Sequence, residues 1–275
     1  MHSVKALLCR DQFGKLELTE VNRFFKGSLD VPNIGEIELN RHVYRTVSYA
    51  RLMEMFETKQ NTLVKPILWE DTFENFILKS TLRDEEGRII EYDLHQRMYG
   101  QCWTLEKSSD AMWRIYSPNK DGVRIRTTID LLLESLCLAT IDRKRCEHCI
   151  GKVEYLREME LIKRAKETFT SRGQITFGKL FRSLLLKRRA FKHENEVRLM
   201  FCDFAEGAGV DKLFKYDVEP HKLITQIMID PRVSHEEFKL VEQGIRQRTS
   251  YKGEIKRSLL YRLPESLILD VQLNE

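Results

Sequence analysis

Short segments in which apolar and polar residues alternate, or in which apolar residues form brief runs, predict strands in five parts of the chain. These segments cover residues 36–47, 99–104, 122–128, 191–201 and 223–229. Between them, apolar residues recur at helical spacing, most clearly in the leucine-rich segment 129–142. The predicted helices cover residues 48–59, 111–116, 129–142, 153–167, 175–190 and 234–248. The order of elements lacks the strand–helix–strand rhythm of a doubly wound parallel sheet, so the pattern predicts a different mixed fold.

A chain of 275 residues is long enough to bury a large core, and it shows neither an internal repeat nor a linker rich in Gly, Pro or Ser. We therefore expect one α+β domain over residues 1–275, with an N-terminal extension at 1–40 and a helical insert at 129–190. The apolar run at residues 6–9 is too short for a signal peptide, and no apolar stretch approaches the length of a membrane span. These features predict a cytoplasmic protein that does not associate with membranes.

The six cysteines are scattered and mostly lie in apolar runs, as expected for reduced thiols in a cytosolic compartment. Cys146 and Cys149 differ, because with His148 between them they have the spacing of half a zinc site. A structural zinc site needs four ligands and no second pair follows, so the alternative is a polar turn after a helix. No metal site is predicted. The net charge of +4 permits nucleic acid as a partner without requiring it.

The most informative chemistry lies in the segment around residues 191–201. If this segment is a strand, Glu194, Glu196 and Arg198 project from one face, because side chains alternate across a strand. Two carboxylates that lie so close repel each other, and at least one acquires a raised pKa unless a cation or substrate separates them. The alternative is a solvated edge strand with alternating charge.

Arg45 gives a second indication of a site, because it falls on the same predicted strand face as Val43 and Val47. A cation that points where apolar side chains point needs an anionic partner or ligand. On the predicted helix at 111–116, Trp113 and Tyr116 share one face, and they are candidates either for the core or for a pocket.

Several familiar enzyme classes lack their motifs in this sequence. There is no Gly-x-Gly-x-x-Gly after a strand, no phosphate loop ending in Gly-Lys-Ser/Thr, no His-Glu-x-x-His and no Gly-x-Ser-x-Gly. A dehydrogenase, a P-loop NTPase and an α/β hydrolase are therefore disfavoured.

An ordered set of motifs between residues 42 and 262 resembles a bacterial family catalogued as a domain of unknown function, whose members often lie near defence genes. The family pattern is Tyr-Arg, Asp-Pro-Phe-Glu, Cys-Phe-Ser/Thr, Met-Trp-x-x-Tyr, Glu-x-Glu-x-Arg and a strand ending in Gly-Pro. The chain departs from it at Thr72, where the family usually has proline, and at Asp230, where it usually has glycine. The matching segments are Tyr44-Arg45, Trp69–Glu74, Gln101–Thr104, Met112–Tyr116, Glu194–Arg198 and Ile227–Pro231.

The same order of an early arginine, a middle hydroxyl and a late Glu-x-Glu is similar to the signature of ADP-ribosyltransferases. This resemblance implies a split, mostly antiparallel sheet with helical insertions, and a cleft that binds NAD as substrate. It implies that Glu196 stabilises the oxocarbenium-like ribose, that Glu194 activates the acceptor, and that Arg45 pairs with the diphosphate. Thr104 would support Glu196, and Trp113 or Tyr116 would offer a face to nicotinamide or a base. The residues expected to bind NAD are Tyr44, Arg45, Thr104, Trp113, Tyr116 and Arg198.

Two classes of function follow from this set. The first is an NAD-dependent ADP-ribosyltransferase, a toxin or anti-phage defence effector with a possible antitoxin partner, or an NAD glycohydrolase. Basic clusters favour nucleic acid such as RNA over protein as the macromolecular acceptor. The second is a non-catalytic binding or regulatory module in which the Glu-Arg strand is a structural ion network. The basic clusters are Arg143, Lys144, Arg145, Lys187, Arg188 and Arg189.

Overall fold

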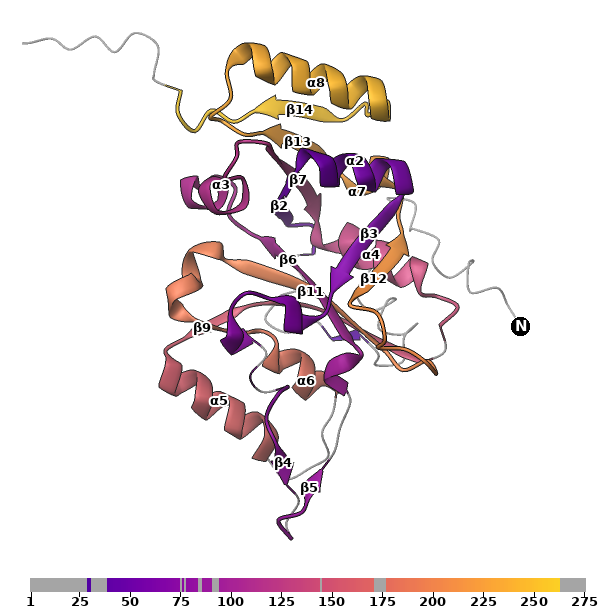
Figure 1. Cartoon of the computed structure of the whole chain (residues 1–275), viewed down its shortest axis with the longest axis vertical. Helices are drawn as coiled ribbons and strands as arrows, with labels where there is room; N and C mark the ends of the chain where they lie inside the picture. Colours follow the sequence, from indigo (N-terminus) through magenta and orange to yellow (C-terminus); the bar gives the residue numbers. More distant parts are fainter. Residues whose placement is uncertain are drawn as a thin grey trace, which may run out of the picture.

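The computed structural model describes residues 29–30 and 39–262, except 75, 77, 84–85, 91–93, 144 and 171–176. Most of the expected N-terminal extension at 1–40 therefore lies outside the described residues. Eight strands of a ten-stranded sheet follow the order β1-β8-β11-β6-β2-β7-β13-β14, while β3 joins β6 and β12 joins β3 (Figure 1). These strands are β1 (Leu29–Asp30), β2 (His42–Ser48), β3 (Gln60–Val64), β6 (Met98–Thr104), β7 (Gly122–Thr128), β8 (Cys146–Lys152), β11 (Glu196–Asp203), β12 (Leu213–Asp217), β13 (Gln226–Ile229) and β14 (Glu254–Arg257).

The remaining described elements are two small sheets, the α-helices and short 3-10 helices. The small sheets pair β4 (Leu82–Arg83) with β5 (Ile89–Ile90), and β9 (Glu154–Leu156) with β10 (Leu186–Arg188). The α-helices are α2 (Tyr49–Thr58), α3 (Asp110–Tyr116), α4 (Ile129–Ala139), α5 (Glu158–Thr170), α6 (Phe177–Ser183), α7 (Pro220–Leu223) and α8 (His235–Thr249). The 3-10 helices are η3 (Pro66–Leu68), η4 (Thr72–Glu74), η5 (Leu94–Gln96) and η6 (Arg189–Glu194).

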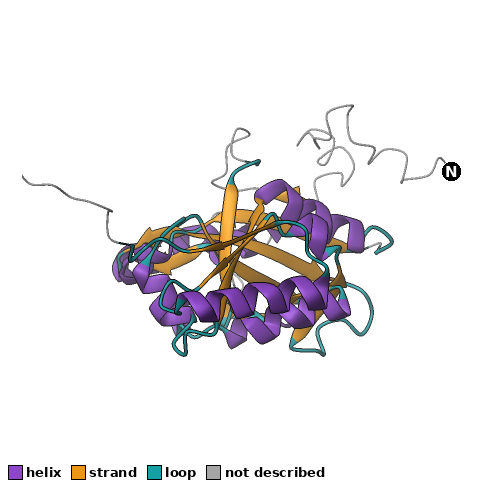
Figure 2. Ribbon diagram, turned by 90° about the horizontal axis from the view of Figure 1, so that it is seen from above, coloured by secondary structure: helices purple, strands orange, loops and turns teal. Residues whose placement is uncertain are grey.

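The large sheet is mostly antiparallel, as expected. Only the pairs β1–β8 and β13–β14 are parallel, whereas the pairs of β11 with β6 and β8, and of β7 with β2 and β13, are antiparallel. Helices lie on both sides of the twisted sheet, which confirms the α+β class (Figure 2). Among the described residues, no helix is both long and apolar enough to cross a bilayer.

The sheet is split beside β6. One edge of β6 pairs with β11 over seven residues, but the other edge is shared by two strands that each meet it at a single position. Strand β2 meets β6 at Tyr44 opposite Thr104, and β3 meets it at Val64 opposite Gly100. Between these two points β2 and β3 diverge, and α2 connects their far ends. This split is the structural feature that makes room for a site.

Local sequence signals set several element boundaries correctly. The Ser48 side chain accepts a hydrogen bond from the Arg51 amide at the start of α2, and the Ser109 side chain accepts one from the Met112 amide in α3. Ser234 caps α8 with a capping box: its side chain accepts a bond from the Glu237 amide, and the Glu237 side chain accepts one from the Ser234 amide. Helix α4 begins at Ile129, as predicted, but ends at Ala139 rather than near residue 142.

Other boundaries were predicted wrongly. Residues 129–190 are not purely helical, because β8, β9 and β10 lie between α4 and η6. The predicted strand at 223–229 begins only at Gln226, after the short helix α7. The predicted strand at 191–201 begins only at Glu196, because residues 189–194 form η6, which ends with Asn195 in the left-handed conformation. Glu194 therefore lies on η6 and not on the strand.

The two faces of β11 belong to different hydrophobic clusters. Val197, Leu199 and Phe201 belong to the large hydrophobic cluster that also contains residues of α2, α4 and α8, which confirms the apolar face predicted for this segment. Met200 and Cys202 on the opposite face pack with residues of α6. Glu196 and Arg198 share this second face, so their charges enter the protein interior beside an apolar cluster.

Candidate functional site

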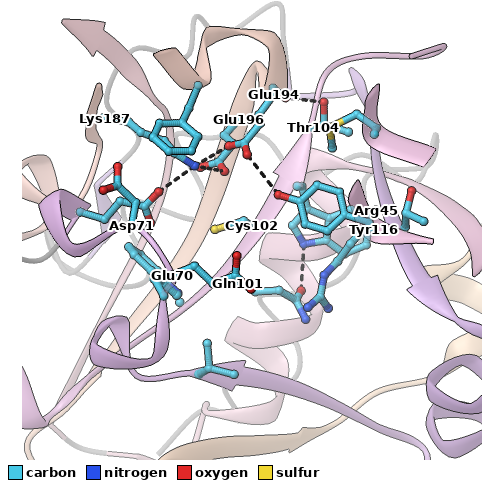
Figure 3. A pocket seen from close by; sticks show the side chains of 18 of the residues that line it. Arg45, Glu70, Asp71, Gln101, Cys102, Thr104, Tyr116, Lys187, Glu194 and Glu196 are labelled. Atoms are coloured by element: carbon cyan, nitrogen blue, oxygen red, sulfur yellow. Dashed lines mark hydrogen bonds and ion pairs between the residues drawn. The ribbon is translucent and has the colours of Figure 1, made fainter. Parts of the chain in front are cut away.

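A cavity of about 300 Å³ lies where β2, β3 and β6 part, facing the start of β11 (Figure 3). Its volume is at the lower end of the range of small-molecule sites. Six of the residues expected in a site line it, together with the segment 68–74 and two residues that follow α6. These six are Tyr44, Arg45, Thr104, Tyr116, Glu194 and Glu196. The structure therefore brings together residues from five elements, β2, β6, α3, η6 and β11, of which only β6 with α3 and η6 with β11 are neighbours in the sequence.

Lys187 holds the acidic end of this cavity together. Its Nζ lies 2.7 Å from Glu74 Oε1 and 3.0 Å from Glu196 Oε1, and it also contacts Glu194 Oε2 (Figure 3). All four side chains are about 95% buried. Burial alone would lower the pKa of Lys187, but the carboxylates of Glu196 and Glu74 raise it above its ordinary value. Lys187 therefore remains a cation that separates the carboxylates.

Arg198 is a second cation that contacts carboxylates of the same cluster. Its Nε and Nη2 lie 2.7 and 2.6 Å from Glu196 Oε2, and Nη2 lies 3.1 Å from Glu74 Oε1. Its Nη1 donates a 2.6 Å bond to the Leu184 carbonyl. The guanidinium lies 4.4 Å from the centre of the Trp69 ring. Arg198 is fully buried and does not line the cavity, so it positions Glu196 rather than contacting a ligand there.

The two glutamates have opposite protonation behaviour. Burial, together with the neighbouring Glu196 carboxylate, raises the pKa of Glu194 to about 7. Burial would also raise the pKa of Glu196, but the charges of Arg198 and Lys187 outweigh it and lower that pKa to about 2. Near neutral pH, Glu196 is therefore ionised while Glu194 is close to its titration midpoint. Two carboxyl groups with such separated pKa values are suited to two different roles in one reaction.

Tyr116 lines the cavity and contacts Glu194. Its hydroxyl donates a 3.2 Å bond to Glu194 Oε1, and burial raises the pKa of this tyrosine. The residue is 43% exposed, so part of its ring is open to solvent. Phe191, from η6, also lines the cavity, and the centre of its ring lies 4.7 Å from Lys187 Nζ.

Arg45 differs from Lys187, the other cation of the described lining, because it has no ion-pair partner. Within the described part of the chain, no carboxylate forms an ion pair with its guanidinium, although Arg124, Arg188, Arg198 and Lys187 all have partners. Burial lowers the pKa of Arg45 from its ordinary value. In Figure 3 it lies across the cavity from Lys187. A partly buried guanidinium without a counter-ion is suited to an anionic ligand.

The structure places three expected site residues differently from the sequence interpretation. Trp113 is 1% exposed and does not line the cavity, so of the two aromatic faces considered only Tyr116 remains available. Arg198 is the buried support described above. The Thr104 hydroxyl donates a 2.5 Å bond to the main-chain carbonyl of Glu194, not to the Glu196 carboxylate. Thr104 therefore fixes the end of η6 beside the site.

Sequence interpretation missed Lys187 and Glu74. Lys187 belongs to a basic cluster that the sequence interpretation relates to nucleic acid, but it is buried, and the neighbouring Arg188 pairs with Asp71 at 2.7 Å. The apolar residues 184–186 immediately before Lys187 were the signal that could have identified a buried lysine. Glu74 belongs to a quoted motif, but only the fold shows that it joins the Glu196 cluster.

Trp69 covers the cluster because Gly100 leaves room for its ring. A Cβ atom at Gly100 would lie 2.8 Å from Trp69 Cζ2, which is closer than packed side chains tolerate. The glycine therefore lets the indole lie across β6 and contact Arg198.

The Cys146–Cys149 segment is neither a turn nor a metal centre in the described structure. It forms the first half of β8, and two residues three positions apart on a strand point to opposite faces. His148, between them, is buried, and burial lowers its pKa to about 4. Among the described residues, no three His, Cys, Asp or Glu side chains are grouped as metal ligands would be.

Three solved structures of DarT from Thermus sp. 2.9 are similar to this chain at 10% sequence identity. The complex with carba-NAD+ covers 80% of this chain and 96% of its own, with a TM-score of 0.35, and the complex with NAD+ has the same coverage and a TM-score of 0.34. The complex with ADP-ribosylated ssDNA covers 80% of this chain and 94% of its own, with a TM-score of 0.37.

No curated protein matches the sequence. A family model does match residues 112–199, a range that contains Tyr116, Lys187, Glu194 and Glu196. Over this part of the chain, the resemblance to a family of unknown function is confirmed, and the family is the one described as "Protein of unknown function (DUF2971)".

Proposed function

We propose that this protein is an NAD-dependent ADP-ribosyltransferase that modifies a macromolecule, with nucleic acid favoured over protein. The observation that carries the proposal is one cavity that combines an ionised Glu196, a titratable Glu194 and an Arg45 that forms no ion pair with any described residue. The ordered Arg and Thr motifs on β2 and β6, and the Glu-x-Glu motif at the junction of η6 and β11, support the same reaction class.

The reaction breaks the bond between C1′ of the ribose and the nicotinamide nitrogen, and nicotinamide leaves with the bonding electron pair. The positive charge that develops at C1′ is stabilised by the Glu196 carboxylate, which is ionised and rigidly held. Lys187 and Arg198 make three close contacts to the Glu196 oxygens. A carboxylate has about four acceptor sites, and a side-chain hydrogen bond with Glu194 uses the fourth, so a ribose hydroxyl takes the place of Glu194 at that site. The acceptor nucleophile then bonds to C1′, and its proton passes to Glu194.

Arg45 and Tyr116 serve binding in this proposal. The planar guanidinium of Arg45 pairs with the diphosphate by two parallel hydrogen bonds. The half-exposed ring of Tyr116 supplies a face for nicotinamide or for a base of the acceptor. Tyr44 contributes less directly, because its ring already contacts Arg124, whose Cζ lies 4.7 Å from the ring centre.

The surroundings of Glu194 favour a polyanionic acceptor. The exposed residues Arg189, Lys192 and His193 lie on η6, the helix that ends at Glu194. Phe191 of the same helix lines the cavity. Cations beside an accessible aromatic ring are the combination that binds single-stranded nucleic acid, through phosphate contacts and base stacking. Such an enzyme would act as a toxin or defence effector.

The direct test is transfer of label. The protein is incubated with NAD labelled in the adenylate half and with RNA, DNA and protein separately, and each product is digested with nuclease or protease. We expect nuclease-sensitive label on nucleic acid. Free labelled ADP-ribose without labelled polymer would indicate a glycohydrolase instead.

A second candidate function is a non-catalytic binding module. The observation that favours it is the ion network itself, because Glu74, Glu196, Lys187 and Arg198 neutralise one another inside the protein. Binding of NAD without release of nicotinamide would support this alternative.

Glu194→Gln is expected to suppress transfer while NAD cleavage continues, because Glu194 serves the acceptor and not the leaving group. In the wild type the rate of transfer should rise with pH through about 7, since a raised pKa means that Glu194 becomes an ionised base only above that value. The variant should lack this rise. Transfer and nicotinamide release are measured separately from pH 5.5 to 8.5, and an unchanged profile in Glu194→Gln would remove Glu194 from acceptor activation.

Arg45→Lys is expected to weaken NAD binding by about tenfold, because an ammonium keeps the charge but cannot reproduce two parallel hydrogen bonds to a diphosphate. Titration calorimetry measures the dissociation constant, with Arg248→Lys at an exposed position of α8 as a comparison for loss of a guanidinium outside both the site and its surroundings. An unchanged dissociation constant for Arg45→Lys would place the diphosphate elsewhere.

Overproduction of the wild-type chain in a bacterium is expected to arrest growth, because an unrestrained transferase would modify an essential polymer. Growth is compared with that of cells producing Glu196→Gln to the same level. Normal growth with abundant folded wild-type protein would contradict a toxin role.

A further inference from the structure

A second cavity, of about 170 Å³, occupies the other part of the split between β2 and β3. The β2, α2 and β3 segments supply most of its lining, and β12 adds Leu213 and Lys215. Arg45 and Val64 line both this cavity and the first one. The two cavities therefore lie on either side of Arg45.

The lining of the second cavity has the composition of a nucleotide site. Its apolar lining includes Leu52, Met55 and Ile125, all of them buried. Arg51 and Lys215 add two positive charges to that of Arg45, and Glu54 is the one carboxylate in the lining. Glu54 lies 2.8 Å from Arg51 and 3.8 Å from Lys215, so the described lining keeps an excess of positive charge. Apolar surface for a base beside cations for phosphate is typical of such sites.

The position of Arg45 relates the two cavities to one ligand. Its guanidinium has no counter-ion among the described residues, and it stands at the boundary between an acidic cavity and a basic one. A ligand that spans both needs an anionic middle at Arg45 and an uncharged or cationic group near Glu196. Its other end must combine an apolar ring with further phosphate oxygens.

We propose that the cavity between β2, α2 and β3 binds the adenosine monophosphate half of the dinucleotide, while the nicotinamide ribose occupies the cavity of Glu194 and Glu196. This inference rests on the proposed function for the identity of the dinucleotide. It adds the location of the adenylate half and assigns Arg51, Lys215 and Thr62 to substrate binding.

Two variants test the assignment. Thr62→Trp fills the second cavity, and the Thr62 side chain makes no hydrogen bond in the described structure that the change would break. Arg51→Gln with Lys215→Gln removes two partly exposed charges. The matched controls are Leu138→Trp, at an exposed position of α4, and Lys163→Gln with Lys239→Gln, at exposed positions of α5 and α8.

Titration calorimetry with ADP-ribose and with nicotinamide mononucleotide gives the readout. We expect both cavity variants to bind ADP-ribose at least about tenfold more weakly than the wild type, and to bind nicotinamide mononucleotide within about twofold of it. The controls should match the wild type for both ligands, and thermal melting establishes that all variants are folded.

The inference would be overturned if both folded variants bound ADP-ribose with wild-type affinity. It would also be overturned if the variants lost affinity for ADP-ribose and for nicotinamide mononucleotide equally, or if the wild type did not bind ADP-ribose. If the wild type binds ADP-ribose, the variants lose it and no preparation cleaves NAD, the proposed function fails while the assignment of this cavity stands.

Discussion

Glu196→Gln is expected to abolish NAD cleavage and transfer together, each by a factor of about 10² or more. Glutamine keeps the volume and some hydrogen bonding of the side chain, but it removes the charge that stabilises the developing positive charge on the ribose. Because Glu196 is the group with the pKa lowered to about 2, it is fully ionised wherever the enzyme is assayed. Nicotinamide release and label transfer on purified protein measure the loss.

The same substitution also disturbs the ion network, so a control must separate the two effects. Glu74→Gln removes a carboxylate that contacts the same two cations, Lys187 and Arg198. We expect both variants to melt below the wild type, because each leaves buried cations with less compensation. Only Glu196→Gln should lose activity below its melting temperature. Equal activities of the two variants would show that Glu196 is structural, and the transferase proposal would fail.

Lys187→Met is expected to lower the free energy of unfolding by about 3–5 kcal/mol near neutral pH, the cost of breaking a buried ion pair by removing one partner. The methionine fills similar volume, but Glu74, Glu194 and Glu196 then lose the ammonium that all three contact. Lys187 lowers the pKa values of Glu194 and Glu196, so these two values in the folded state must rise when the ammonium is removed. Carboxyl groups whose folded pKa exceeds the unfolded value destabilise the fold as pH rises, so the loss should be larger at pH 8 than at pH 5.

Urea unfolding of the wild type and the variant at both pH values measures this effect. Lys163→Met is the matched control, because Lys163 is exposed and its nearest carboxylate lies 3.9 Å away. Its stability should change by no more than about 0.5 kcal/mol. A small, pH-independent loss for Lys187→Met would contradict the central position of Lys187 among the three carboxylates.

Much of the chain could be predicted because the signals are local. A capping serine bonds to an amide only three residues away, as at Ser48, Ser109 and Ser234. The apolar stripe in 129–139 likewise depends on residues three or four positions apart. The alternation in 197–201 identified a strand with one apolar face for the same reason. Errors occurred where a local pattern had two readings, as in residues 146–152, whose polar residues suggested a turn but which pair with β11 in the sheet.

The site is less local. The sequence by itself determined that Glu194, Glu196 and Arg45 are unusual, because charged residues in apolar strand patterns need partners wherever they fold. Only the tertiary structure decided who those partners are. Lys187 and Glu74 are separated by more than a hundred positions, and they meet because η4 packs against β10, which no periodicity encodes. The surroundings of Arg45 are also set by tertiary structure. Strands β2 and β3 pair with β6 at separate positions and diverge between them, which opens a cavity on each side of the guanidinium. No described residue supplies a counter-ion there.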